Sequence, residues 1–217
     1  MRATHVRQLH PLRGSLLVLL VLATAWSSAA VAEHVLPAPL LQEGFKAQRV
    51  GAGLLTWFGF DIYEASLWST DGDFANFDPA ADAQRQVAFS LWYRRSFSRE
   101  RLIEITTSGW SEFKLASPEQ QQRWRADLAR LWVDVNKGSN LTTVVLPGGE
   151  TRFYDAQRRL GSIADPAFGP AFLRIWLDER TRGTRLESLR TALLGNSAAA
   201  RAGCVRMASG KPANPCN

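Results

Sequence analysis

Apolar residues recur at every second position in two stretches of the first half of the chain. Over residues 46–69, Phe58 and Phe60 follow this alternation in a context rich in aromatic and β-branched residues, and residues 86–95 repeat it. This period of two predicts extended structure in both stretches. A polar loop over residues 71–85 is expected between them.

Gly51 and Gly53 lie near the start of the first extended stretch. Glycine weakens a strand because it has no side chain to pack, so a pair of glycines there needs a reason. We expect a β-bulge or the close approach of another segment of backbone at this point.

The apolar spacing then changes to that of helices. Ser98 is placed to cap a helix that runs to about residue 114. Ser117 begins a second capping pattern, Ser-Pro-Glu-Gln, with proline at the first helical position. The helix that follows has one apolar face, formed by Trp124, Leu128, Leu131, Trp132 and Val135.

The second half of the chain repeats the order of strands followed by helices. Residues 141–146 and 151–154 are predicted to form a hairpin around Pro-Gly-Gly, with residues 158–163 as a third strand. A helix is expected after Asp165-Pro166, and a last helix between a capping pattern at Thr184 and Gly195. The first of these has the apolar face Phe168, Phe172, Ile175 and Trp176.

This order of elements, without an internal repeat, indicates the fold class. Hairpins between neighbouring strands favour an α+β fold in which an antiparallel β-sheet is covered on one face by a layer of helices. We assign this domain to residues 33–195. Residues 196–217 are rich in Ala, Ser, Gly and Pro without periodicity, and are expected to be a flexible tail.

The N-terminus has the three parts of a secretory signal peptide. Residues 1–15 contain Arg and no acid, residues 16–23 are apolar, and Ala30 and Ala32 supply a small-x-small cleavage pattern. The apolar run is shorter than the roughly 20 residues that a membrane anchor needs. We therefore expect cleavage after Ala32 and a periplasmic or secreted protein without a membrane span.

Composition excludes several classes of function. The formal charge is +6, but the excess lies in the signal and the tail, so residues 33–195 are balanced and do not indicate nucleic-acid binding. All three histidines occur at or before residue 34, which removes His-based triads and the commonest transition-metal ligand. We expect no metal site and no cofactor. Cys204 and Cys216 both lie in the tail, and whether they pair is open.

Aromatic residues are the strongest candidates for a binding site. Three tryptophans on apolar helix faces are expected in the core: Trp124, Trp132 and Trp176. Trp57, Trp92 and Tyr93 lie on predicted strands, where aromatic rings either pack the core or line a cleft for an apolar ligand.

Arg94 and Arg95 follow Tyr93 directly. Neighbours on a strand face opposite ways, so one of the two arginines can point inward and pair with a carboxylate or phenolate. The alternative is that both belong to a solvated strand end.

Short blocks in order along residues 44–195 resemble the chalcone isomerase-like family, in its bacterial exported branch. The blocks are Val-Gly-Ala-Gly at 50–53, Phe-Gly-Phe-Asp-Ile-Tyr-Glu-Ala-Ser-Leu-Trp at 58–68, Leu-Trp-Tyr-Arg-Arg at 91–95, Arg-Phe-Tyr at 152–154, Asp-Pro-Ala-Phe at 165–168 and Leu-Leu-Gly at 193–195. The resemblance implies a chalcone isomerase-like open-faced sandwich with an apolar cleft between sheet and helices.

The resemblance also implies two kinds of activity. Plant members cyclise chalcones with the help of an arginine that holds the phenolate, whereas other relatives bind fatty acids without known catalysis. That arginine follows the glycines as Gly-x-Gly-x-Arg, and this chain has Leu55 in its place. Leucine cannot hold a phenolate, so chalcone isomerisation is not expected.

We therefore favour non-catalytic binding of an apolar or amphipathic, fatty-acid-like molecule in an aromatic-lined cleft. The residues selected for it are Trp57, Tyr63, Trp92, Tyr93, Arg95 and Trp110. Two alternatives stay open. An isomerase of the intramolecular lyase type would use Tyr63 or Tyr93 as acid and Arg95 as anion clamp, and a ligand-free envelope scaffold would fill the cleft with its own tryptophans.

Overall fold

The computed structural model describes residues 35–74 and 85–195. The predicted signal peptide, most of the polar loop after residue 74, the predicted tail and both cysteines lie outside the described residues.

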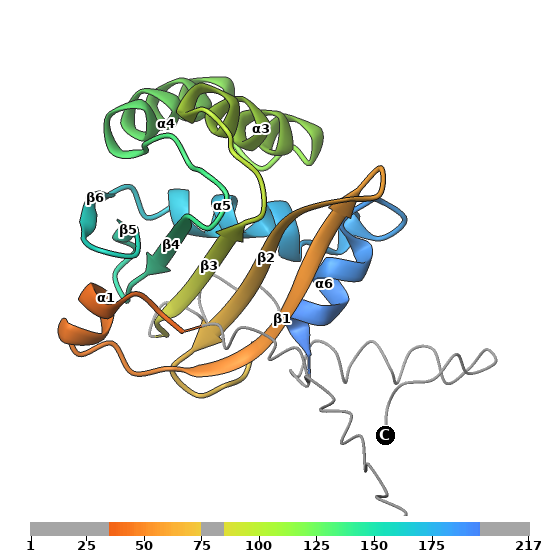
Figure 1. Cartoon of the computed structure of the whole chain (residues 1–217). Coiled ribbons are helices and arrows are strands. Elements are labelled where there is room, and N and C mark those ends of the chain that lie inside the picture. Colours follow the sequence, from red (N-terminus) through yellow and green to blue (C-terminus); the bar gives the residue numbers. More distant parts are fainter. Residues whose placement is uncertain (1–34, 75–84, 196–217) are drawn as a thin grey trace, which may run out of the picture. The chain divides into compact units, whose positions relative to one another are not determined.

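Six strands form one antiparallel sheet in the order in which they follow one another along the chain (Figure 1). They are β1 (Gln48–Trp57), β2 (Phe60–Ser69), β3 (Val87–Tyr93), β4 (Asn140–Val145), β5 (Thr151–Tyr154) and β6 (Arg159–Ile163). Each neighbouring pair is antiparallel. The predicted antiparallel sheet of an α+β fold is confirmed.

The first extended stretch is a hairpin rather than one continuous run. Trp57 pairs with Phe60, and the two residues between them, Phe58 and Gly59, have positive φ angles of 48° and 76°. Our expectation of unbroken alternation through Phe58 is wrong. A two-residue turn of this kind is usually marked by Asn-Gly or Asp-Gly, and Phe-Gly carries no such signal.

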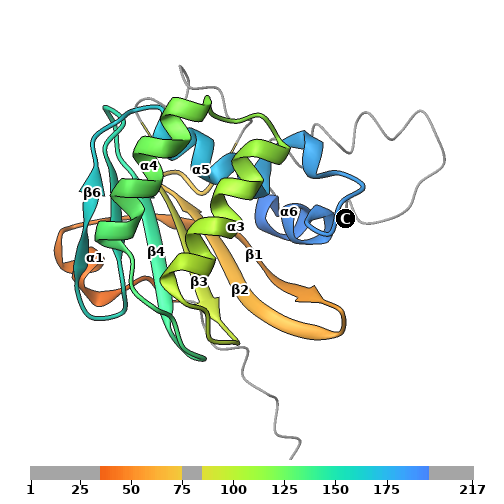
Figure 2. The same ribbon diagram turned by 90° about the horizontal axis from the view of Figure 1, so that it is seen from above.

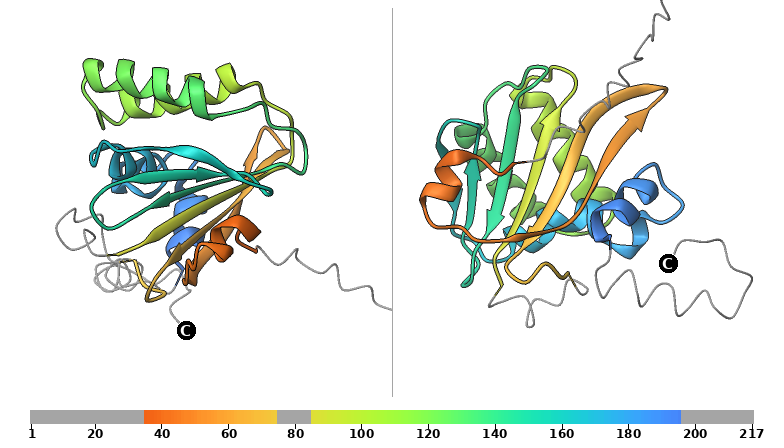
Figure 3. Two further views of the ribbon diagram at one scale, coloured as in Figure 1. Left: turned by 90° about the vertical axis from the view of Figure 1, so that its left-hand side faces the viewer. Right: turned by 60° about the horizontal axis from the view of Figure 1, so that its bottom comes forward.

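Four helices cover one face of the sheet, as predicted (Figure 2). They are α3 (Arg99–Glu112), α4 (Pro118–Leu131), α5 (Phe168–Leu177) and α6 (Glu187–Leu194), and the 3-10 turn η1 (Glu179–Thr181) lies between the last two. A short N-terminal helix, α1 (Ala38–Gln42), lies on the opposite face (Figure 3). There Leu36, Leu40 and Phe45 pack against the sheet in a smaller apolar cluster.

The helix starts follow the capping residues. The Ser98 hydroxyl accepts a hydrogen bond from the Arg101 N–H at 3.2 Å. Ser117 and Gln120 exchange two hydrogen bonds, in which each side chain accepts from the main chain of the other. These bonds satisfy N–H groups that have no partner inside the helix, so both predicted starts are confirmed.

Helix α6 lies directly on β1 because that strand carries glycines. A Cβ atom at Gly51 would lie 2.2 Å from the carbonyl oxygen of Ala192, and one at Gly53 would lie 2.7 Å from the Ala192 Cβ. The same stretch contains a bulge, since Arg49 and Gly51 pair with the consecutive residues Trp68 and Leu67. The bulge and the close backbone approach predicted from these glycines are both present.

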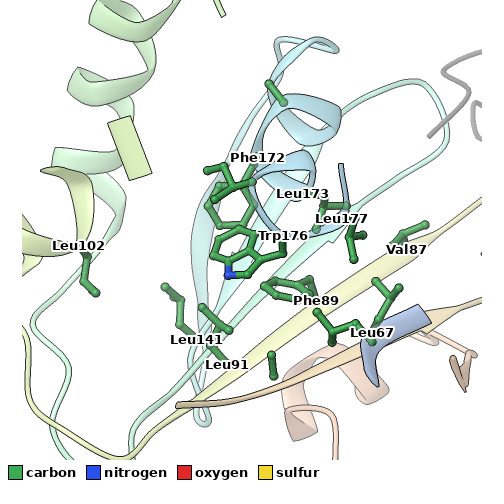
Figure 4. Packing of buried hydrophobic residues seen from close by; sticks show 14 of the residues in the cluster. Leu67, Val87, Phe89, Leu91, Leu102, Leu141, Phe172, Leu173, Trp176 and Leu177 are labelled. Carbon is green, nitrogen blue, oxygen red and sulfur yellow. The ribbon is translucent and has the colours of Figure 1, made fainter. Parts of the chain in front are cut away.

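The core between sheet and helices is rich in aromatic rings. Trp176 and Phe172 point from α5 towards the sheet, and the ring centroids of Trp176 and Phe89 are 4.7 Å apart (Figure 4). Deeper under α3 and α4, the rings of Trp110, Trp124 and Phe168 meet edge to face at 5.1–5.8 Å. Rings in this geometry stabilise each other beyond the area they bury.

Candidate ligand-binding site

A pocket of about 220 Å³ lies between helix α3 and the sheet. Strands β1 to β4 form one side of it, and helices α3 and α5 form the other. Helix α3 packs on α4 and α5 more than on the strands below it. Space therefore remains between α3 and the end of the β1–β2 hairpin.

A second bulge shapes the sheet side of this pocket. Leu55 pairs with Tyr63 and Thr56 with Asp61, so Ile62 is the extra residue on β2. An extra residue breaks the strict alternation of a strand. As a result, Ile62 and Tyr63 both line the pocket although they are neighbours.

Two tyrosine hydroxyls are the main polar groups inside the pocket. The Tyr63 hydroxyl accepts a hydrogen bond from Trp176 Nε1 at 2.8 Å, which leaves its own proton available. The Tyr93 hydroxyl has no hydrogen-bond partner among the described residues. The two rings meet nearly edge to face, with centroids 6.0 Å apart.

Both hydroxyls are neutral over the physiological pH range. Burial raises the pKa of Tyr63 to about 12, although the hydrogen bond from Trp176 and the charge of Arg185 act in the opposite direction. Burial, and to a smaller extent the nearby Tyr63, raise the pKa of Tyr93 well above its usual value. Such groups donate hydrogen bonds to a ligand, but they are poor proton acceptors at neutral pH.

Three charged residues reach the pocket from its solvent-exposed side. Arg101 is paired with Glu104 at 2.7 Å, and Glu112 is exposed on the last turn of α3. Arg185 lies in the loop before α6, with its Cζ 5.9 Å from the Trp57 ring centroid. Within the described part of the chain Arg185 forms no ion pair, so its charge is available to a ligand.

The pocket contains half of the residues selected from the sequence. Trp57, Tyr63 and Tyr93 line it. Trp92 does not, because it is the neighbour of Tyr93 on β3 and faces the other side of the sheet. Trp92 is therefore not among the residues that line this pocket.

Arg95 and Trp110 also lie outside this pocket. Arg95 is exposed beyond the end of β3, with its Cζ 4.2 Å above the Phe60 ring. Trp110 is fully buried in the aromatic core. Position at a strand end or on a helix face does not by itself define which side chains reach a cavity, and neither residue lines this one.

Several lining residues were not selected from the sequence. Helix α3 contributes Leu102, Ile105 and Thr106, which share one helical face at spacings of three and four residues. That spacing was a usable signal. Arg185 had no local signal, since its position depends on how the loop before α6 returns to the tip of the β1–β2 hairpin.

Leu55 lies in the pocket wall and is 8% exposed. This is the position at which the family resemblance leads one to expect an arginine. The wall is therefore apolar here, and among the described residues Arg185 is the only cation at the pocket without an ion pair.

Residues 35–74 and 85–195 contain no group of three or more His, Cys, Asp or Glu able to hold a metal ion. None of their helices is long and apolar enough to cross a bilayer.

Comparisons with known proteins agree with this architecture. A fatty-acid binding protein from Arabidopsis thaliana has a similar structure, with a TM-score of 0.50 and 13% identity over 69% of this chain and 87% of that chain. At this identity the likeness shows a common fold. The comparison with curated proteins gave no match. A family model described as chalcone isomerase-like matches residues 30–195. The chain therefore belongs to the chalcone isomerase-like family.

Proposed function

We propose that this domain binds a small amphipathic molecule with a carboxylate headgroup, of the fatty-acid type, without transforming it. The observation that carries this proposal is the composition of the pocket. It combines apolar and aromatic walls, two neutral tyrosine hydroxyls and an arginine that has no ion pair within the described residues.

The size of the pocket supports a ligand with a short apolar body. A cavity of about 150 Å³ is enough to hold benzene. At about 220 Å³, this pocket takes an apolar body roughly one and a half times as large. Because exposed residues such as Ile105 and Trp57 lie along its lining, a longer chain can extend out of it.

The binding energy would come from two sources. Each methylene group that leaves water contributes about 0.8 kcal/mol. The carboxylate would accept a charge-assisted hydrogen bond from Arg185, which lies close enough to Tyr63 to act on its phenol group. The likeness in fold to a plant fatty-acid binding protein is consistent with this class of ligand.

The proposal of binding without catalysis is supported by what lines the pocket. An intramolecular addition needs a base or a group that stabilises a phenolate. Leu55 stands where the family resemblance implies the arginine that holds the phenolate, and it cannot stabilise an anion. Arg185 reaches the pocket only from its solvent-exposed side, and the raised pKa values of Tyr63 and Tyr93 keep these groups from acting as bases near neutral pH.

We also propose that the protein acts outside the cytoplasm. This rests on the charged, apolar and small-residue segments that end at Ala32. Cell fractionation followed by N-terminal sequencing tests it. A mature protein that begins at Glu33 is expected, and an intact N-terminus in the cytoplasmic fraction would contradict it.

Titration calorimetry with decanoate and decanol tests the binding proposal. Leu102→Trp fills the pocket and should abolish binding of both compounds, whereas Val133→Trp adds the same side chain at an exposed position and should not. Arg185→Gln should lower the affinity for decanoate by about tenfold and leave the affinity for decanol unchanged. Arg182→Gln, a charge loss in the same loop, is the matched control.

Two results would overturn the proposal. One is the absence of decanoate and decanol binding to the unchanged protein. The other is equal affinity of the unchanged protein and the Leu102→Trp variant, because the ligand would then occupy another place.

A further inference from the structure

The tip of the β1–β2 hairpin exposes three large aromatic side chains. Trp57, Phe58 and Phe60 are 50%, 81% and 55% exposed. None of the helices in residues 35–74 and 85–195 lies over the end of this hairpin (Figure 2). We refer to these three residues as the aromatic tip. Exposed aromatic residues that gather in one place commonly mark an interaction site.

Phe58 is unfavourable at its position for two reasons. Its φ angle of 48° is a left-handed conformation that residues with a Cβ atom rarely adopt, and this kind of turn favours Asn or Asp there. Its ring is also the most exposed of the three, and among the described residues its one ring contact is with Trp57, at 5.0 Å. Neither turn geometry nor packing within the domain accounts for a phenylalanine here, which points to a role in contact with something else.

Two arginines accompany the aromatic tip. Arg95 lies 4.2 Å from the Phe60 ring centroid, and Arg185 lies 5.9 Å from that of Trp57. Neither forms an ion pair within the described residues, whereas the neighbouring Arg94 is paired with Glu64. The tip therefore combines exposed rings with two cations that have no ion pair in the described part of the chain, and the exposed Asp61 lies beside it.

We propose that the aromatic tip docks on the surface of a membrane that contains anionic lipids. Aromatic rings favour the headgroup region of a bilayer, and guanidinium groups bind phosphates. A stable protein partner would need about 800 Å² of matching surface on each side. A two-residue turn with three exposed rings is small for that, but it suits insertion among lipid headgroups.

The place of the tip also connects it with the pocket. Trp57 and Arg185 belong both to the tip region and to the lining of the pocket. Docking would therefore hold the pocket near a membrane, where amphipathic molecules accumulate. This connection rests on the proposed function, whereas the docking itself does not.

Co-sedimentation with vesicles of phosphatidylcholine, with or without phosphatidylglycerol, tests the docking. We expect binding to the mixed vesicles and little to phosphatidylcholine alone, with a decrease as salt rises. Phe58→Asn should weaken binding by about tenfold. Since asparagine is favoured in this turn, misfolding would not explain that loss. Leu41→Asn changes an equally apolar residue that is 47% exposed on α1, and should have no effect.

Two outcomes would overturn this inference. One is failure of the unchanged protein to sediment with the mixed vesicles. If Phe58→Asn then separates a dimer or a protein complex, the aromatic tip binds protein and not a membrane. The other is equal binding of Phe58→Asn and the unchanged protein. Phe58 does not line the pocket, so decanoate affinity measured on the same variant separates a failure of docking from a failure of the proposed function.

Discussion

Replacing Gly51 with alanine places a methyl group in the contact between β1 and helix α6. The new Cβ would lie 2.2 Å from the Ala192 oxygen, 2.5 Å from the Leu193 oxygen and 2.8 Å from the Leu193 carbonyl carbon. All three are main-chain atoms, so no side-chain rotation relieves the overlap. Helix α6 has to move away from the strand.

The expected loss of stability follows from two opposing effects. Overpacking a well-packed core typically costs about 1–3 kcal/mol, and contact with main-chain atoms places this case near the upper end. Alanine is better than glycine inside a strand by roughly 0.5–1 kcal/mol. We therefore expect Gly51→Ala to lower the free energy of unfolding by about 2 kcal/mol, which corresponds to a fall in Tm of about 4–8 °C for a domain of this size.

Gly53→Ala is the matched control in the same strand. Its Cβ would meet the Ala192 Cβ at 2.7 Å and the Leu189 Cδ1 at 3.1 Å, which are side-chain atoms, and Leu189 can rotate. Gly53→Ala should therefore lower the free energy of unfolding by less, about 1 kcal/mol. Urea unfolding followed by circular dichroism measures both variants. If Gly51→Ala is as stable as the unchanged protein, or more stable than Gly53→Ala, the direct packing of α6 on β1 is wrong.

Three further predictions concern single residues. Asp178 accepts hydrogen bonds from Arg180 and Arg174, which hold the pKa of its carboxyl well below the usual range. Its stabilising effect is therefore present at neutral pH and lost as pH falls below about 4. Asp178→Asn should lower the free energy of unfolding at neutral pH and make it depend less on pH below about 4; the same acid dependence in both proteins would contradict this. Ser117→Ala removes the hydroxyl that accepts the hydrogen bond from the Gln120 N–H and should lower the free energy of unfolding in urea by about 1 kcal/mol, and an unchanged midpoint would count against the capping box. Because burial raises the pKa of Tyr63 to about 12, stability should fall as pH rises from about 10 to 12, and Tyr63→Phe should reduce that fall in thermal unfolding.

Local signals located two helix starts and one strand correctly, and misplaced a third helix start. Ser98 and Ser117 cap the helices that they were expected to cap, and β5 has the predicted bounds of residues 151–154. At Thr184 the capping pattern was present, but helix α6 begins later, at Glu187. Thr184 accepts from the Leu186 N–H and Glu187 accepts from the Gly183 N–H, so these side chains stabilise a turn that precedes the helix.

The candidate site was less accessible from the sequence. Alternation shows that Trp92 and Tyr93 face opposite sides of a strand, but the packing of distant helices decides which side holds the pocket. Arg185 lies 128 positions after Trp57, inside a capping pattern that predicts a helix start and no binding role, yet it reaches the Trp57 ring. Such a juxtaposition depends on the whole fold, and no local pattern indicates it.

A crystal structure with a decanoate brominated at its terminal carbon tests the central claim most directly, because the anomalous signal of bromine locates the tail. We predict a bromine peak between α3 and the sheet, near Leu102 and Leu141, with the carboxylate within hydrogen-bond distance of Arg185. A bromine peak elsewhere on the domain, or an empty pocket at saturating ligand, would contradict the account.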